Sequence, residues 1–356
     1  APDSWDGIRN CLVYGSTAPI TKMTDPDGGD FIIPHRYWAQ SENCQNLNVW
    51  TQDLDTNAKK PVMVWFHGGG YTNGSSIEGV AYDGKNLSEY GDVVVVTVNH
   101  RLNVLGYMDL SDYGEDYQYS GNCGTADLVA SLKWVKENIA NFGGDPDNVT
   151  IFGQSGGGGK VISMLASPKA EGLFNQAIVQ SGSERYIEKD IDQDIAKKVT
   201  AKTLEILGIS DNEVEQLKEV PYDTLDAAAT EAQKQVGEEL GTSVGWSPVL
   251  DEDYLHTDFL DWTNDVPVMV GSVFGEMNCW TALDPNETNK NSWTDEEVDA
   301  KLTEKYGDKA EAVKEAFLKA YPEKSACDAY YVSNRTGDFG TLAKRLECER
   351  YLRFLR

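Results

Sequence analysis

A serine set among glycines gives the clearest chemical signal in this sequence. Ser155 is the central residue of the stretch G-Q-S-G-G at 153 to 157, which matches the pattern G-x-S-x-G. In a nucleophile elbow of this kind a strained turn exposes the serine hydroxyl, and the flanking glycines remove Cβ atoms that would collide. A strand-like run precedes the serine, and Lys160 to Ala166, which is compatible with a helix, follows it. We therefore expect Ser155 to be a nucleophile.

A second glycine cluster supplies candidate donors for that nucleophile. A serine hydroxyl attacks a carbonyl effectively only when a base takes its proton and N–H groups hold the oxyanion that forms. The stretch His67-Gly68-Gly69-Gly70 follows a strand-like run, and glycines let backbone amides approach a substrate oxygen closely. The amide of Gly156, at a helix start, is a further candidate donor. His67 is expected to brace this loop rather than to transfer protons.

The same glycines do not fit a phosphate-binding loop. A Walker loop ending at Lys160 would need glycine at 154 and serine or threonine at 161, where the chain has Gln154 and Val161. The dinucleotide pattern G-x-G-x-x-G also fails, because it would need glycine at Val161 or Ile162. No nucleotide is expected at this site.

Alternating strands and helices are predicted to position these residues. Buried strands are indicated by short apolar, β-branched or aromatic runs at 46–51, 61–66, 92–99, 149–152, 175–181 and 266–273. Between Thr125 and Asn141 apolar residues recur every three or four positions, which predicts a helix with Thr125 as its N-cap, ended by Gly143 and Gly144. This order predicts a mostly parallel sheet with the Ser155 strand in its interior.

Two further segments are predicted to be helical. Residues 187–235 are polar with a rough helical period, as in a helical excursion from the sheet. Residues 291–321 predict a helical pair, in which Thr294 and Glu297 form a capping box and Gly307 ends the first helix. We expect one domain over residues 1–356, with helical insertions at about 184–265 and 281–356.

Composition narrows the class of partner. A formal net charge of -27 and a pI near 4.4 argue against nucleic acids and anionic membranes, and are typical of a soluble protein. No run of about 18 apolar residues predicts a membrane span. The first residues contain no signal peptide pattern, which favours a cytoplasmic over a secreted location. The 6 cysteines and 4 histidines lie scattered, without C-x-x-C or H-E-x-x-H, so no metal site is expected.

Several longer stretches resemble the type-B carboxylesterase family of α/β-hydrolases, which includes the cholinesterases and bacterial p-nitrobenzyl-type esterases. The similar stretches are S-E-N-C-Q-N-L-N-V-W at 41–50, V-W-F-H-G-G-G at 64–70, V-N-H-R-L-N at 98–103, the segment 121–157, Q-S-G-S at 180–183 and V-P-V-M-V-G-S-V-F-G-E at 266–276. The resemblance implies an α/β-hydrolase fold, with a mostly parallel central sheet and helices on both faces. It also implies hydrolysis of small-molecule carboxylic esters through an acyl-enzyme, without a cofactor.

By matched position the resemblance also implies roles for single residues. Ser155 would be the nucleophile, Gly69, Gly70 and Gly156 the oxyanion donors, and Glu276 the triad acid that orients a histidine. Because Glu276 follows a predicted strand, we expect it at the same edge of the sheet as Ser155.

The chain departs from the family pattern in three ways. Gln154 and Gly156 stand where the family often has Glu and Ala, and the family's N-terminal β segment is missing ahead of Trp5. The family's triad histidine lies well after the acid, yet no histidine follows His256. We therefore expect an internal portion of a longer esterase. Alone, it should hydrolyse activated esters feebly, retaining at most the roughly 10³ to 10⁴-fold that oxyanion donors and binding provide.

Other functions remain open on the sequence. The family also contains non-catalytic cholinesterase-like adhesion and binding modules, although their expected mark, a lost nucleophile or oxyanion loop, is not found here. An inactive truncated esterase, or an amidase or thioesterase on the same scaffold, would carry the same motifs.

Overall fold

The computed structural model describes residue 7 and residues 10–20, 36–182, 193–256, 265–273 and 293–333. Contacts between Cα atoms divide the chain into two compact units, residues 1–269 and 270–356. The first unit contains Ser155 and most of the sheet, and the second contains a small group of helices. The organisation into one domain with helical insertions stays a prediction.

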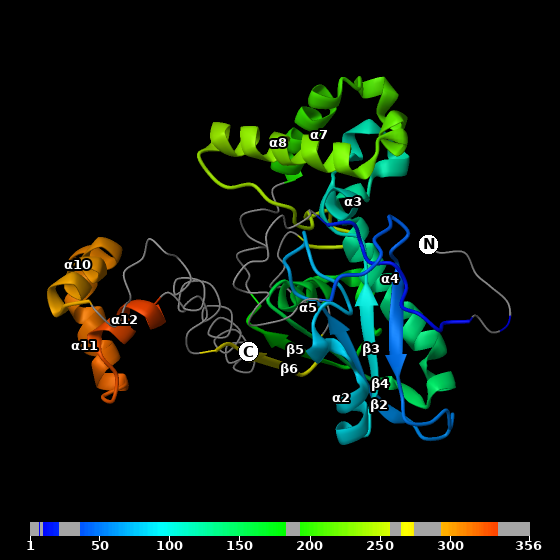
Figure 1. The fold of residues 1–356 in the computed structure, drawn as a ribbon, viewed down its shortest axis with the longest axis horizontal. Helices are drawn as coiled ribbons and strands as arrows, with labels where there is room; N and C mark the ends of the chain where they lie inside the picture. The colour runs from blue at the N-terminus through cyan, green and yellow to red at the C-terminus, as the bar shows by residue number, and fades with distance from the viewer. Residues whose placement is uncertain are drawn as a thin grey trace. The chain divides into compact units, whose positions relative to one another are not determined.

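The described strands form one sheet in the spatial order β1-β3-β2-β4-β5-β6 (Figure 1). Their bounds are Asn46–Trp50 for β1, Lys60–Phe66 for β2, Val94–Asn99 for β3, Gly144–Gln154 for β4, Gln176–Gln180 for β5 and Val268–Gly271 for β6. The central pairs β3–β2, β2–β4 and β4–β5 are parallel, and β1 runs antiparallel to β3. These results confirm the predicted strands and the interior position of β4.

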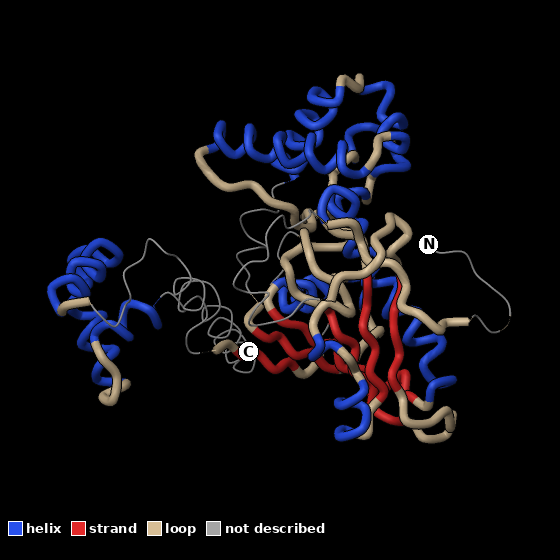
Figure 2. The backbone as a smooth tube through the Cα atoms, in the orientation of Figure 1, coloured by secondary structure: helices blue, strands red, loops and turns tan. Residues whose placement is uncertain are grey.

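Burial explains why these segments form strands. Every residue of β3 is buried, and its sequence V-V-V-T-V-N is β-branched except for the final asparagine. Such residues fit a pleated surface covered on both sides, which is typical of a parallel sheet. Figure 2 shows the strands, in red, lying side by side, and a single residue, Ser155, separates β4 from the helix that follows it.

The helices of the first unit are α2 (Lys85–Gly91), α3 (Asn103–Tyr107), α4 (Cys123–Asn138), α5 (Gly156–Ala166), α7 (Gln193–Leu207) and α8 (Tyr222–Leu240). Short 3-10 turns join them: η1 (Val80–Tyr82), η2 (Ser111–Tyr113), η3 (Glu115–Tyr117), η4 (Ser120–Asn122), η5 (Ile139–Phe142), η6 (Pro168–Ala170) and η7 (Asp211–Glu219). Helix α5 packs on β4 and β5 and contacts α4, while α7 and α8 pack on each other. The helical excursion predicted for residues 187–235 is confirmed over its described part.

Helix α4 begins earlier than the sequence predicts. It starts at Cys123 with Asn122 in the N-cap position, so Thr125 lies inside the helix and the predicted N-cap was wrong. The Asn122 side chain does not cap the helix, because its oxygen, the atom that would accept from the first turn, accepts instead from the backbone amide of Val249 at 3.2 Å. Its amide donates to Val249 O at 2.7 Å and to Asp251 Oδ2 at 2.9 Å. Distant partners therefore set the start of this helix, which a local pattern does not reveal.

The second unit contains α10 (Asp295–Tyr306), η9 (Gly307–Lys309), α11 (Ala310–Ala320) and α12 (Ala326–Ser333). Thr294 and Glu297 form the predicted capping box, and α10 ends at the predicted Gly307. The buried residues Val298 and Leu302 hold these helices together with Ala310. Throughout the described ranges, none of the helices combines the length and apolarity that a bilayer crossing requires.

Candidate active site

Ser155 lies at the turn between β4 and α5, with a backbone conformation that side chains rarely adopt. Its φ is 57° and its ψ is -125°. The Ser155 amide donates to Gln180 O at 2.9 Å, and its carbonyl accepts from the amide of Gly159 at 3.1 Å. The end of β5 and the first turn of α5 thus hold a conformation that costs about 1–3 kcal/mol by itself. The residue is half-buried.

Close approach to β2 explains the glycines around Ser155. A Cβ atom on Gly157 would overlap the carbonyl oxygen of Phe66 and lie 2.9 Å from that of His67. A Cβ atom on Gly153 would lie 2.8 Å from the same Phe66 oxygen. The turn therefore fits against the end of β2 only without side chains at these two positions.

The loop at 67–70 lies beside the serine. A Cβ atom on Gly68 would lie 3.6 Å from the Cβ atom of Ser155. A Cβ atom on Gly156 would overlap the nitrogen and Cα atoms of Gly70 and lie 2.6 Å from its oxygen. The structure thus brings the backbones of Gly70 and Gly156 together next to Ser155.

Hydrogen bonds fix the direction of the amides in this loop. Gly69 and Gly70 have φ values of 86° and 62°, which favour glycine. The carbonyl of Gly68 pairs with Nδ1 of His67 at 2.8 Å, and the carbonyl of Gly69 accepts from the amide of Asn73 at 2.9 Å. In a trans peptide the N–H points opposite to the C=O, so the amides of Gly69 and Gly70 are directed away from these partners.

His67 braces this loop in its neutral form. Because a carbonyl oxygen only accepts, the bond to Gly68 places the proton on Nδ1 of His67. Burial and the charge of Lys160 lower the pKa of His67 well below its usual value. His100 stacks on it with ring centroids 5.1 Å apart, and burial likewise lowers the pKa of His100. Among the described residues, no histidine nitrogen hydrogen-bonds to the Ser155 hydroxyl.

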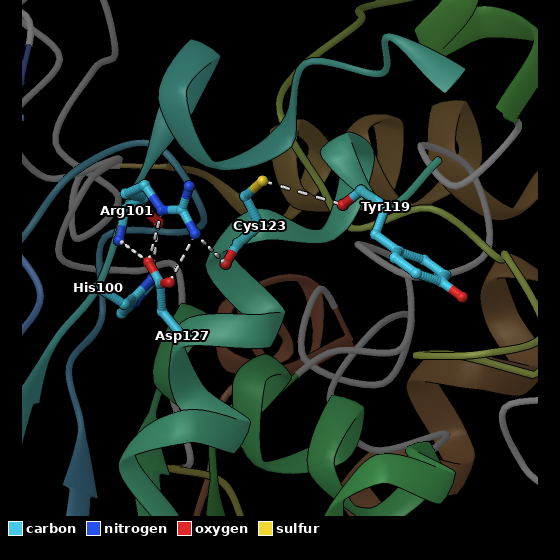
Figure 3. Close-up of polar contacts among 5 residues, drawn as sticks. All are labelled: His100, Arg101, Tyr119, Cys123 and Asp127. Carbon is cyan, nitrogen blue, oxygen red and sulfur yellow. Dashed lines mark hydrogen bonds and ion pairs between the residues drawn. The ribbon is translucent and has the colours of Figure 1, made fainter. Parts of the chain in front are cut away.

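An ion pair fixes the chain just after β3 to helix α4 (Figure 3). Arg101 donates from Nε to Asp127 Oδ2 at 2.9 Å and from Nη2 to Oδ1 at 2.7 Å, and its backbone amide also donates to Oδ2 at 2.9 Å. Nη2 of Arg101 further contacts the carbonyl of Cys123 at 3.4 Å. This bidentate pair holds the H-R-L-N stretch in place. No local sequence pattern predicts this pair, since the two residues lie 26 positions apart.

One predicted site residue lies outside the described residues. Glu276 lies in the range 274–292, outside the residues that the structure describes, so its role as triad acid stays a prediction. Among the described side chains, no group of three or more His, Cys, Asp or Glu residues is arranged to hold a metal ion.

A buried lysine was not foreseen as part of this site. Lys160, on α5, is fully buried, and its Nζ donates to the carbonyl of His67 at 2.9 Å. Its one sequence signal was the presence of a charged residue in an otherwise glycine-rich and apolar stretch.

The parallel sheet, the strained serine after β4 and the glycine loop after β2 together define a protein with the α/β-hydrolase fold. A model of the carboxylesterase family matches residues 1–341. The chain belongs to this family.

Individual relatives agree with this assignment. The chain is 40% identical over 228 residues to the para-nitrobenzyl esterase of Bacillus subtilis (strain 168), a match that covers 64% of this chain and 44% of the relative. It is 50% identical over 191 residues to carboxylesterase 1D of Rattus norvegicus, covering 51% of this chain and 31% of the relative.

Solved structures of esterases also match. An esterase from Clostridium hathewayi, described as able to hydrolyse aliphatic aromatic polyesters, superposes with a TM-score of 0.76 at 44% sequence identity. That match covers 90% of this chain and 63% of the solved one. The chain therefore spans less than two thirds of the length of these relatives.

Proposed function

We propose that this chain carries the nucleophile and the oxyanion hole of a serine carboxylesterase. The observation that carries the proposal is the strained Ser155, held at the end of β4 directly beside the loop of Gly68, Gly69 and Gly70. Membership of the carboxylesterase family supports the same reaction.

In the proposed reaction the Oγ atom of Ser155 attacks the carbonyl carbon of an ester while its proton passes to a general base. The amides of Gly69, Gly70 and Gly156 hold the negative oxygen of the tetrahedral intermediate. Collapse of the intermediate breaks the bond to the alcohol, which leaves with a proton and gives an acyl-enzyme on Ser155. Attack by water then releases the acid and restores the hydroxyl.

Two members of the triad follow from the family pattern. Glu276 would orient the histidine and stabilise the imidazolium that forms during attack. The histidine itself is not assigned to any of the 4 histidines in this sequence. The 356 residues alone are therefore expected to turn over activated esters slowly.

Covalent labelling tests the proposal on this polypeptide. A fluorophosphonate should add one phosphonyl group to the folded chain, located by mass spectrometry on the peptide that contains Ser155. Ser155→Ala and the urea-unfolded parent should stay unlabelled. A folded parent chain that resists labelling at high reagent concentration would overturn the proposal and favour a non-catalytic binding module. Rapid turnover of p-nitrophenyl acetate that Ser155→Ala abolishes would instead assign the base to one of the four present histidines.

A further inference from the structure

Lys160 is a charged residue in a place that lysine rarely occupies. It lies on α5, five positions after Ser155, and all eleven residues of this helix are buried. Lysine is almost never fully buried unless it is paired. A charged ammonium at this position, on the helix that follows Ser155, therefore costs free energy through desolvation.

The contacts of Lys160 point to the loop beside Ser155. Its Nζ donates to the carbonyl oxygen of His67 at 2.9 Å, across 93 positions of sequence. His67 is the residue directly before Gly68. The ring of Tyr71, the first residue after Gly70, lies 6.0 Å from the same Nζ atom. The ammonium thus contacts the glycine loop at its start and approaches it at its end.

With Lys160 included, three consecutive carbonyls of the loop each have a donor. The carbonyl of His67 accepts from Lys160, that of Gly68 from the ring of His67, and that of Gly69 from the amide of Asn73. Fixing a carbonyl also fixes the following amide, because the two belong to one planar peptide unit. The first of these three donors, Lys160, lies on α5, the helix whose N-cap residue is Ser155.

We propose that Lys160 is a positioning residue for the oxyanion loop, which it ties to the nucleophile's helix through the carbonyl of His67. This inference rests on the proposed esterase function. Lys160 contacts neither substrate nor reacting atoms in this role. It fixes the peptide that joins His67 to Gly68, which is the first peptide of the loop that presents the amides of Gly69 and Gly70. A displacement of about 1 Å in such groups can lower a rate about 100-fold.

The ionisation of Lys160 gives the proposal a pH signature. Burial lowers the pKa of Lys160 to about 7, although the negative charge of Glu78 raises it. Among the described residues, the other titratable groups that face it are the neutral His67 and His100 and the phenol of Tyr71. A charged ammonium makes a stronger hydrogen bond to a carbonyl than a neutral amine does. The contribution of Lys160 should therefore decline as the pH rises through about 7.

The test compares the parent with Lys160→Met, which keeps an unbranched side chain of nearly the same length and removes the donor. Lys133→Met on the exposed face of α4 is the matched control. Two quantities are measured on each full chain. The first is the rate of fluorophosphonate labelling of Ser155 between pH 6 and pH 9, and the second is hydrogen exchange of the amides at 67–74. Lys160→Gln, whose amide is too short to reach as far, is the second variant should Lys160→Met fail to fold.

The proposal predicts that Lys160→Met labels about 10 to 100-fold more slowly than the parent at pH 6. The parent rate divided by the Lys160→Met rate should fall toward pH 9, because Lys160 loses its charge as the pH rises. Every other titrating group is common to the two proteins, so these groups cancel in the ratio. The loop amides should exchange at least about tenfold faster in the variant, and Lys133→Met should match the parent in both measurements.

Three outcomes would overturn the proposal. Equal labelling and equal exchange in Lys160→Met and the parent would show that the loop needs no such anchor. Slower labelling with a constant ratio across pH and unchanged exchange would place the effect elsewhere. Loss of labelling to the level of Ser155→Ala with unchanged exchange would make Lys160 a base instead. A parent that does not label at all would refute the esterase function, whereas loop exchange would still decide the role of Lys160.

Discussion

Gly157 in α5 lies so close to Phe66 at the end of β2 that a Cβ atom on Gly157 would overlap the Phe66 carbonyl oxygen. Both partners are backbone in the centre of the sheet region, so neither can move aside as a flexible side chain would. This contact sets the distance between the turn that bears Ser155 and the loop that follows β2. The geometry of the candidate site therefore depends on the absence of one methyl group.

Gly157→Ala should accordingly disrupt the site. We expect fluorophosphonate labelling of Ser155 to fall by at least about 100-fold and the free energy of unfolding to fall by about 2 kcal/mol or more, as for overpacking in a core. Labelling rates and urea unfolding measure the two effects. Gly245→Ala is the control, because a Cβ atom there meets nothing within 4 Å. Parent-like labelling by Gly157→Ala would show that the contact is not tight.

The strained backbone of Ser155 predicts a difference between two inactive variants. With φ at 57°, alanine at this position keeps the strain, whereas glycine relieves it. Ser155→Gly should therefore be more stable than Ser155→Ala by about 1 kcal/mol, even though glycine gains entropy in the unfolded state. Chemical denaturation of the two variants measures this difference. If Ser155→Ala were the more stable of the two, the backbone at this turn would not be strained.

The buried Lys160 predicts how stability depends on pH. The unfolded side chain has a pKa near 10.5, and burial lowers the pKa of the folded one to about 7. Between these values the unfolded state binds the extra proton, so the free energy of unfolding rises with pH, by at most about 5 kcal/mol at 1.36 kcal/mol per unit. Relative to the parent, Lys160→Met should be most stable below about pH 7 and should lose that advantage toward pH 9. Urea unfolding at pH 6, 7.5 and 9 tests this, and a constant difference would contradict it.

The pair formed by Arg101 and Asp127 should contribute more than an ordinary surface ion pair. The side chain of Asp127 is only 9% exposed and accepts hydrogen bonds from three N–H groups of Arg101. Asp127→Asn leaves the Arg101 guanidinium without its charge partner, so we expect the free energy of unfolding to fall by about 3 kcal/mol. In the control Asp147→Asn the side chain is 79% exposed, so solvent screens its ion pair and the loss should be much smaller than for Asp127→Asn. Similar losses in both variants, measured by chemical denaturation, would rule out a special role for the buried pair.

The sequence by itself determined those features that depend on neighbouring residues. The β-branched runs gave the strands, the glycines at 153 and 157 gave the turn at Ser155, and the spacing of Thr294 and Glu297 gave a capping box. Each rests on sterics or hydrogen bonds within a few positions, which the order of residue types records directly.

Only the tertiary structure decided the features that depend on distant partners. Asn122, and not Thr125, occupies the N-cap position of α4, and its side chain bonds to Val249 and Asp251. The carbonyl that accepts from Lys160 lies 93 positions away in the sequence. The contact between Gly156 and Gly70 likewise joins two loops from different strands. Burial and pairing of such groups are set by which surfaces the fold brings together, and no local period or motif encodes that arrangement.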